Sequence, residues 1–137
     1  MHWRIEVPNQ RDRLGALLDA IEQALVAHGI EATVREDLRL IAEEVVSNAM
    51  DYGGCPPDPQ HQIVVDIRRH EDRLHVQFQD SGRPFDPVAH APPDLDADLL
   101  DRPVGGLGVH LVLQIAESVS YVREEPYNIL RVVLRAH

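Results

Sequence analysis

The spacing of apolar residues changes along this chain, and the change limits the folds that it can adopt. From Leu14 to about residue 50, apolar side chains recur every three or four positions, which is the period of an α-helix with one buried face. From Ile63 to Phe78 they alternate with polar ones, which is the period of a strand with one buried face. The chain therefore combines helices and strands that share one core.

The first helix is expected to follow a short strand. Residues 3–7 alternate, and Pro8 ends the strand because proline lacks a backbone donor. Asn9 is a plausible N-cap for a helix that runs to about His28, and Gly29 is a natural stop. The apolar stripe of this helix, which we expect to be core, consists of Leu14, Leu17, Leu18, Ile21 and Leu25.

A second helix is expected next. Thr33 and Glu36 have the spacing of a capping box, and Gly53-Gly54 ends the helical pattern. The apolar positions that repeat at helical spacing are Leu38, Ile41, Ala42, Val45 and Ala49.

The second half predicts more strands. A hairpin covers residues 63–78 with its turn near residues 70–72, and an irregular segment rich in proline and aspartate covers about 81–104. A glycine-rich turn then opens a helix, and two strands follow, at about 118–123 and 128–135. The whole chain, residues 1–137, is expected to form a single domain: a two-layer α/β sandwich with a mixed, largely antiparallel sheet covered on one face by helices.

Composition excludes some classes of function. The formal net charge is −10 and the 13 basic residues form no run, which argues against direct binding of nucleic acid. No apolar run approaches the roughly 20 residues that span a bilayer. The first ten residues, MHWRIEVPNQ, have no apolar signal-peptide core, so we expect a cytoplasmic location and no membrane contact.

Glu44 and Asn48 form the first candidate functional pair. Their spacing of four residues places them on neighbouring turns of one helix face, to one side of the apolar stripe. An amide oxygen beside a carboxylate suits Mg²⁺, which takes few protein ligands and completes its shell with phosphate oxygens. The carboxylate could also act as a general base. By itself such a pair is more often an ordinary solvated helix face.

The second candidate is Asp80-Ser81-Gly82, directly after the second strand of the hairpin. A carboxylate at a strand end can accept a hydrogen bond from an exocyclic amine such as that of adenine, and Gly82 lets a ligand approach the backbone. A tight turn is the alternative reading of the same residues.

The third candidate is the glycine-rich turn that precedes the last helix. Glycines before a helix N-terminus offer backbone N–H groups and the helix dipole to a phosphate. The turn fits neither the Rossmann nor the P-loop pattern, because it does not directly follow a strand and contains no Gly-Lys-Ser/Thr. Its residues are Gly105, Gly106, Leu107, Gly108, Val109 and His110.

These three segments, in this order, resemble the N, G1 and G2 boxes of the GHKL ATPase superfamily, whose domain has the Bergerat ATP-binding fold. The segment at about 81–104 then matches the ATP lid. The runs Asp80-Ser-Gly-Arg-Pro-Phe-Asp-Pro87 and Gly105-Gly-Leu-Gly-Val-His-Leu-Val112 are similar to those of bacterial anti-sigma-factor serine/threonine kinases.

The resemblance implies ATP and Mg²⁺ as cofactors and a role for each matching residue. Glu44 matches the general base, Asn48 the Mg²⁺ ligand, and Asp80 the carboxylate that reads adenine. Tyr52 departs from the best-known serine kinases of the family, which carry histidine there, and this puts kinase activity more in doubt than ATP binding. The remaining implied nucleotide-site residues are Asp51, Tyr52, Gly82, Phe85, Gly105, Gly106, Leu107, Gly108, Val109 and His110.

The resemblance also implies protein partners. The leading hypothesis is a serine/threonine kinase that holds a sigma factor inactive and phosphorylates an antagonist of the STAS class. Relatives form dimers through their sheets, so a homodimer is possible and Trp3 could lie in its interface or in the core. The alternatives are an ATP-binding regulatory module without phosphoryl transfer and a degenerate domain that binds no nucleotide.

Overall fold

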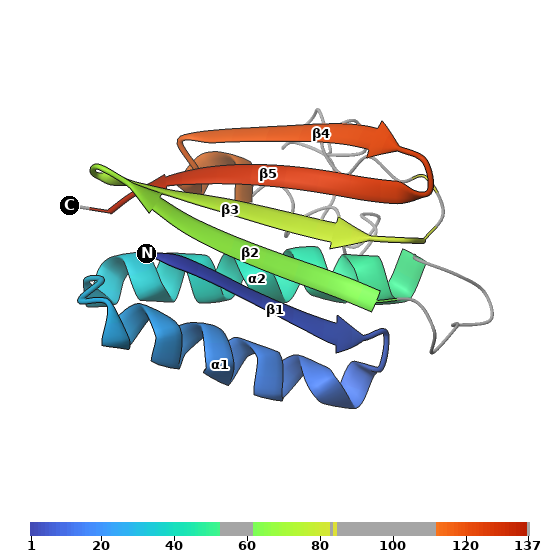
Figure 1. Cartoon of the computed structure of the whole chain (residues 1–137), viewed down its shortest axis with the longest axis horizontal. Coiled ribbons are helices and arrows are strands. Elements are labelled where there is room, and N and C mark those ends of the chain that lie inside the picture. The colour runs from blue at the N-terminus through green and yellow to red at the C-terminus, as the bar shows by residue number, and fades with distance from the viewer. Residues whose placement is uncertain (53–61, 83, 85–111, 137) are drawn as a thin grey trace, which may run out of the picture.

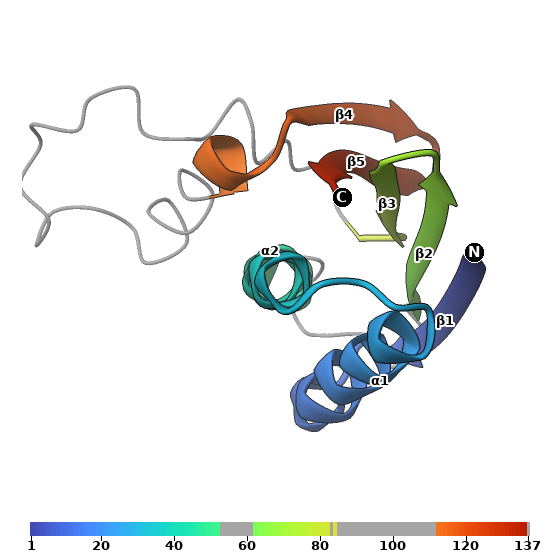
Figure 2. The ribbon, with the colours of Figure 1, turned by 90° about the vertical axis from the view of Figure 1, so that its left-hand side faces the viewer.

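The computed structural model describes residues 1–52, 62–82, 84 and 112–136. Within these residues, five strands form one curved sheet, and two long helices cover its concave side (Figures 1 and 2). The elements are β1 (His2–Pro8), η1 (Arg11–Arg13), α1 (Leu14–Ala27), α2 (Ala32–Tyr52), β2 (Gln62–His70), β3 (Arg73–Asp80), β4 (Ser118–Glu124) and β5 (Tyr127–Arg135).

The strand order in the sheet is β1-β2-β3-β5-β4, and all four pairs are antiparallel. The expected two-layer sandwich is therefore confirmed. The parallel pair that a mixed sheet would contain does not occur among the described strands. Two of the pairs are hairpins with short turns, which can join only antiparallel neighbours.

The core lies between the concave side of the sheet and the helices. Alternate residues of β2, β3 and β5 point to this side, which we call the inner face, and the opposite side is the outer face. Both predicted apolar stripes and the predicted hairpin pattern are confirmed as core, and Trp3 packs against its edge. The largest fully buried side chains are Leu17, Ile21, Leu25, Leu38, Ile41, Ile67, Leu74, Val46, Val65, Val76 and Val132.

The first helix begins later than the sequence predicts. A 3-10 turn, η1, precedes α1, so Asn9 is not the N-cap; it is buried instead. The C-terminus agrees with the prediction. Gly29 has a left-handed φ of 72°, and the Ile30 N–H donates to the Leu25 carbonyl at 3.0 Å. This is the Schellman arrangement that glycine favours.

The second helix begins one residue before Thr33, so the capping box expected there is wrong. Glu31 takes the capping position, and its carbonyl accepts the Arg35 N–H at 3.0 Å. The Arg35 side chain donates to Glu22 at 3.0 Å and to the Ile30 carbonyl at 2.5 Å. The tie between α1 and α2 therefore sets this boundary.

The turn between β2 and β3 consists of Glu71 and Asp72, as predicted, and Glu71 has a left-handed φ of 57°. A left-handed conformation costs a residue with a Cβ about 1–2 kcal/mol, whereas the extra freedom of glycine in the unfolded chain costs about 0.5–1 kcal/mol. We therefore expect Glu71→Gly to raise the free energy of unfolding by about 0.5–1 kcal/mol in a urea titration. Asp72→Gly is the matched control and should lower it; equal effects would contradict this account.

Within the described residues, no helix combines the length and the hydropathy that a membrane-crossing helix requires. Residues 112–115 are helical, and Val112 is buried in the core, in agreement with the helix expected after the glycine-rich turn.

Candidate functional site

The C-terminal end of β3 holds the candidate adenine-reading residue. Asp80 pairs with Asn128 of β5 in the sheet register and lies on the inner face, in the same alternating row as Phe78. One carboxylate oxygen, Oδ1, accepts the Gly82 N–H at 2.9 Å and the Asn128 Nδ2 donor at 3.0 Å. No donor from the described part of the chain reaches Oδ2, so this oxygen can accept a further hydrogen bond.

Asn128 is itself oriented by a neighbour. It is buried, with 6% of its surface exposed, and its Oδ1 accepts the Tyr121 hydroxyl at 2.6 Å. Because the amide oxygen is occupied by this donor, the amide nitrogen faces Asp80. A chain of hydrogen bonds therefore runs from Tyr121 through Asn128 to Asp80 and fixes the orientation of the carboxylate.

Arg123 of β4 holds the backbone beside Asp80. Its Nη1 donates to the Gly82 carbonyl at 2.8 Å, while Nε and Nη2 donate to the two oxygens of Glu125 at 3.0 and 2.9 Å. The hydrogen bonds with Glu125 raise the pKa of Arg123, and the guanidinium lowers the pKa of Glu125. Because Gly82 is buried and its carbonyl accepts the hydrogen bond from Arg123, the turn after β3 is held in place.

Asn48 and Glu44 lie on α2, which packs against β3. Figure 1 shows that the C-terminal ends of α2 and β3 are at the same end of the molecule, and Figure 2 shows α2 beneath the inner face. Asn48 is 8% exposed, and within the described residues its side chain makes no hydrogen bond. A buried amide without a partner is costly unless a ligand satisfies it.

Glu44 is half-buried on the turn before Asn48. Burial, and to a smaller degree the negative charge of the neighbouring Glu43, raise the pKa of Glu44 above its ordinary value. A carboxyl group with a raised pKa is a stronger base once it is ionised, which suits a group that accepts a proton from a hydroxyl.

The remaining sequence candidates fall into two groups. Asp51 is exposed at the end of α2 and forms an ion pair with Arg11 of η1. Tyr52 is the last residue of α2. The following candidates lie outside the described residues, together with most of the predicted lid at about 81–104: Phe85, Gly105, Gly106, Leu107, Gly108, Val109 and His110.

Asn128, Tyr121 and Arg123 belong to none of the motifs that the sequence contains. Asn128 is a polar residue in a row that is otherwise apolar on β5, and this was the only available signal. The signal becomes informative only when β5 is known to pair with β3, because the register then places Asn128 opposite Asp80.

The sequence of this chain matches the histidine kinase-like ATPase domain over residues 7–134. The chain belongs to this family. The match extends from β1 to β5 and includes both α2 and the end of β3. The resemblance to the GHKL superfamily is thereby confirmed.

Two curated relatives are protein kinases. The serine/threonine-protein kinase BtrW of Bordetella bronchiseptica is 28% identical over 97 residues, which cover 71% of this chain and 68% of BtrW. The serine-protein kinase RsbW of Listeria monocytogenes is 25% identical over 99 residues, which cover 69% of this chain and 62% of RsbW. The match thus covers less than two thirds of RsbW.

Solved structures share the fold. The RsbU and RsbW domains of Rv1364c from Mycobacterium tuberculosis match 99% of this chain and 32% of that chain, with a TM-score of 0.73 and 12% identity. The SiaB–SiaC complex from Pseudomonas aeruginosa matches 96% of this chain and 89% of that chain, with a TM-score of 0.67 and 18% identity. The catalytic domain of the histidine kinase ThkA has a TM-score of 0.59 at 13% identity.

Proposed function

We propose that this chain binds ATP with Mg²⁺ and transfers the γ-phosphoryl group to a serine or threonine of a partner protein. The observation that carries the proposal is the fixed Asp80 carboxylate. Its Oδ1 is occupied by Gly82 and Asn128, and its Oδ2 is available on the side of the sheet that faces α2.

The adenine ring fits this carboxylate because its 6-amino group is a donor. The Asp80 Oδ2 accepts one amino hydrogen, while the buried Gly82 has no side chain that would hold the ring away from the backbone. A guanine ring presents an acceptor at the same position, so the carboxylate also favours ATP over GTP.

Asn48 is the residue that would hold Mg²⁺. The fit rests on its buried amide, which lacks a hydrogen-bond partner in the described part of the chain. The described residues contain no cluster of three or more His, Cys, Asp or Glu side chains that could hold a metal. Mg²⁺ would instead complete its shell with phosphate oxygens and water, and it would offset the negative charge of the phosphates.

Glu44 is proposed to act as the general base. The hydroxyl oxygen of the substrate attacks the γ-phosphorus, the bond to the β–γ bridging oxygen breaks, and ADP leaves with that electron pair. Glu44 accepts the hydroxyl proton. Catalysis by this arrangement depends mainly on positioning and electrostatic stabilisation.

The proposed substrate is an antagonist protein of the STAS class, and the proposed regulatory target is a sigma factor. The kinase relatives BtrW and RsbW support phosphoryl transfer to protein, and the SiaB structure was solved in complex with SiaC, so that protein binds a protein partner. This chain would then control transcription by releasing or retaining the sigma factor.

Labelled ATP tests the proposal directly. The purified chain, saturated with Mg-ATP, is incubated with STAS-domain proteins from the same genome, and transfer to serine or threonine is measured. Transfer to one of them is the expected result. If ATP binds and no candidate is phosphorylated, the chain is a nucleotide-dependent binding module; if ATP does not bind, the nucleotide site itself is wrong.

Tyr121→Phe tests whether the hydrogen-bond chain to Asp80 matters. Loss of the hydroxyl leaves the Asn128 amide without its orienting donor, so we expect a destabilisation of about 0.5–1.5 kcal/mol and several-fold weaker ATP binding. Tyr127→Phe, at the first residue of β5, is the matched control because Tyr127 is exposed. Equal ATP affinities of the Tyr121 variant and the parent would contradict the orienting role.

A further inference from the structure

The outer face of the sheet carries two rows of side chains across its five strands, and all of them except Val133 are polar. The register aligns Arg4, Asp66, Gln77, Arg131 and Ser120 in one row. The next row consists of His2, Arg68, His75, Val133 and Ser118. Because the face is opposite to α1 and α2, it is separate from the proposed nucleotide site (Figure 2).

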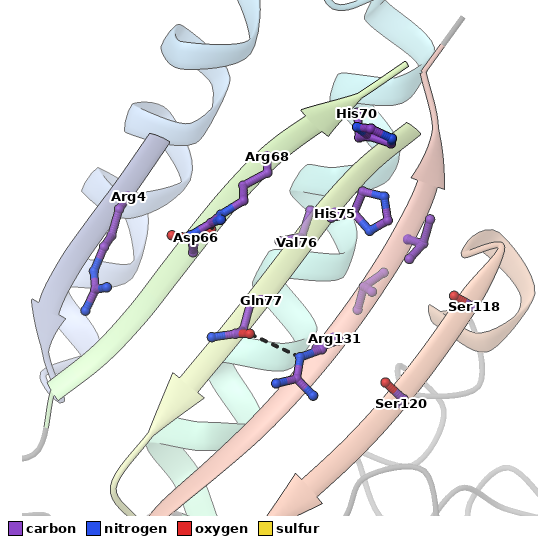
Figure 3. Close-up of a pocket in the computed structure, with 12 residues that line it drawn as sticks. Arg4, Asp66, Arg68, His70, His75, Val76, Gln77, Ser118, Ser120 and Arg131 are labelled. Carbon is purple, nitrogen blue, oxygen red and sulfur yellow. Dashed lines mark hydrogen bonds and ion pairs between the residues drawn. The ribbon is translucent and has the colours of Figure 1, made fainter. Parts of the chain in front are cut away.

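These rows border a depression of about 610 Å³ to which all five strands contribute (Figure 3). We call its three arginines, Arg4, Arg68 and Arg131, the outer basic face. Every one of the 13 basic residues of this chain is arginine, whose planar guanidinium can bind a carboxylate through two parallel hydrogen bonds. Three arginines thus gather at one depression of a chain whose formal net charge is −10.

The carboxylate within these two rows is already engaged. Asp66 accepts hydrogen bonds from His2 Nε2 at 2.8 Å and from Arg68 Nε at 3.1 Å. Burial alone would raise the pKa of Asp66, but these two donors outweigh it and lower the pKa. The ionised Asp66 therefore offsets the charge of Arg68. It accepts no hydrogen bond from the other two arginines.

Arg4 and Arg131 have no carboxylate partner in the described part of the chain. Arg131 donates to the neutral Gln77 side chain at 3.2 Å, which orients the guanidinium and leaves its charge uncompensated (Figure 3). Both arginines are exposed. The guanidinium groups of Arg4 and Arg131 therefore form a positively charged surface beside the depression, and this surface is complementary to negative charge.

The spacing of these arginines favours an extended ligand over a single small anion. Arg4 and Arg131 are separated by three strand positions in one row, so their backbones are about 14 Å apart at about 4.8 Å per strand. Carboxylates four residues apart on an extended chain are separated by about 13 Å. One phosphate or carboxylate could not reach both positions.

The composition of the face and of the chain favours protein over other polyanions. The formal net charge of −10 opposes every polyanion, and it opposes most strongly the densely charged ones, nucleic acid and an anionic lipid surface. The exposed large apolar residues in the described part of the chain are Val26, Leu40 and Tyr127, and none of them lies in these rows, so the face offers nothing to insert into a membrane.

We propose that the outer basic face is a docking surface for an acidic polypeptide segment of a partner protein. The segment lies in an extended conformation across the strands, with carboxylates paired to Arg4 and Arg131. The surface is independent of the nucleotide site, so a partner can occupy it whether or not ATP is bound.

The test uses a fluorescein-labelled peptide of alternating glutamate and serine, and a matched peptide with glutamine in place of each glutamate. Fluorescence polarisation with the full chain, without nucleotide, is expected to show binding of the glutamate peptide that weakens as salt rises. The double variant Arg4→Gln/Arg131→Gln should bind about tenfold more weakly. The matched control is Arg13→Gln/Arg39→Gln on the helical side, which removes the same charge and should bind like the parent.

Each of the following results would overturn the proposal. Equal binding of both peptides, or equal loss in both double variants, would mean that the face recognises no acidic segment. Tighter binding of duplex DNA or of phosphatidylserine vesicles, with the same dependence on Arg4 and Arg131, would assign the face to that class of ligand. A dimer that the Arg4/Arg131 variant dissociates in sedimentation velocity would assign it to a second copy. Since the assay contains no ATP, its failure leaves the proposed kinase activity untouched.

Discussion

Glu44→Gln is expected to lower kcat for phosphoryl transfer by about 10²–10⁴-fold while ATP affinity stays close to that of the parent. Glutamine keeps the size of the side chain and one of its two acceptor oxygens, but it cannot accept the hydroxyl proton. The measurements are single-turnover transfer to the STAS-domain substrate and calorimetric titration with Mg-ATP. Unchanged transfer would show that Glu44 is not the base.

The pH dependence separates Glu44 from its neighbour. A general base acts in its ionised form, so the rate should rise as pH rises through the pKa of Glu44, which burial and Glu43 raise. Glu43→Gln is the matched control: it removes the repulsion, so the acidic limb should move to lower pH while the plateau rate persists. An identical loss of activity in both variants would contradict a specific role for Glu44.

Thermal stability provides a second readout for the Glu44→Gln variant. A carboxyl group whose pKa is raised in the folded state binds its proton more tightly there, so its ionisation destabilises the fold as pH increases through that range. Glu44→Gln removes this charge. It should therefore be at least as stable as the parent at neutral pH in thermal unfolding, which shows that lost transfer is not lost folding.

Asp80→Asn is expected to weaken ATP binding by about 1–3 kcal/mol, or about 5–150-fold. The asparagine Oδ1 can still accept from Gly82 and Asn128, so the fold should persist. Its amide nitrogen then takes the place of Oδ2 and meets the adenine amino group, which places a donor against a donor. Calorimetric titration with Mg-ATP measures the loss, and equal affinity in variant and parent would mean that the adenine lies elsewhere.

GTP supplies the sharper control for this variant. Its O6 acceptor should be repelled by the Asp80 carboxylate and accepted by the asparagine amide, so the preference for ATP over GTP should fall more than the ATP affinity itself. Asp37→Asn is the matched charge control because Asp37 is exposed on α2. A general loss of affinity for both nucleotides would indicate damage to the site, not loss of adenine recognition.

Local patterns predicted the secondary structure but not its boundaries. The alternation in residues 63–78 and the turn residues Glu71-Asp72 are sufficient for a hairpin, and both are observed. The helix starts at Asn9 and Thr33 were wrong because capping propensity is weak beside tertiary contacts. The bonds of Arg35 to Glu22 and to the Ile30 carbonyl, which link α1 to α2, have no signature in the local sequence.

The candidate site was predictable only in part, for the same reason. Glu44, Asn48 and Asp80 belong to short motifs whose spacing is visible in the chain. Asn128 is 48 residues from Asp80, and its importance depends on the pairing of β3 with β5. The burial of Asn48 likewise required the packing of α2 against the sheet, because a helical wheel placed it beside the apolar stripe.

Residues close together in the chain were sufficient to predict the types of element, the buried side of each helix or strand, and the family motifs. The folded structure was needed to show which residues became neighbours across strands. It placed Tyr121 and Asn128 behind Asp80, and it aligned Arg4 with Arg131 on the opposite face. Strand register sets both arrangements, and register arises from pairing between distant segments.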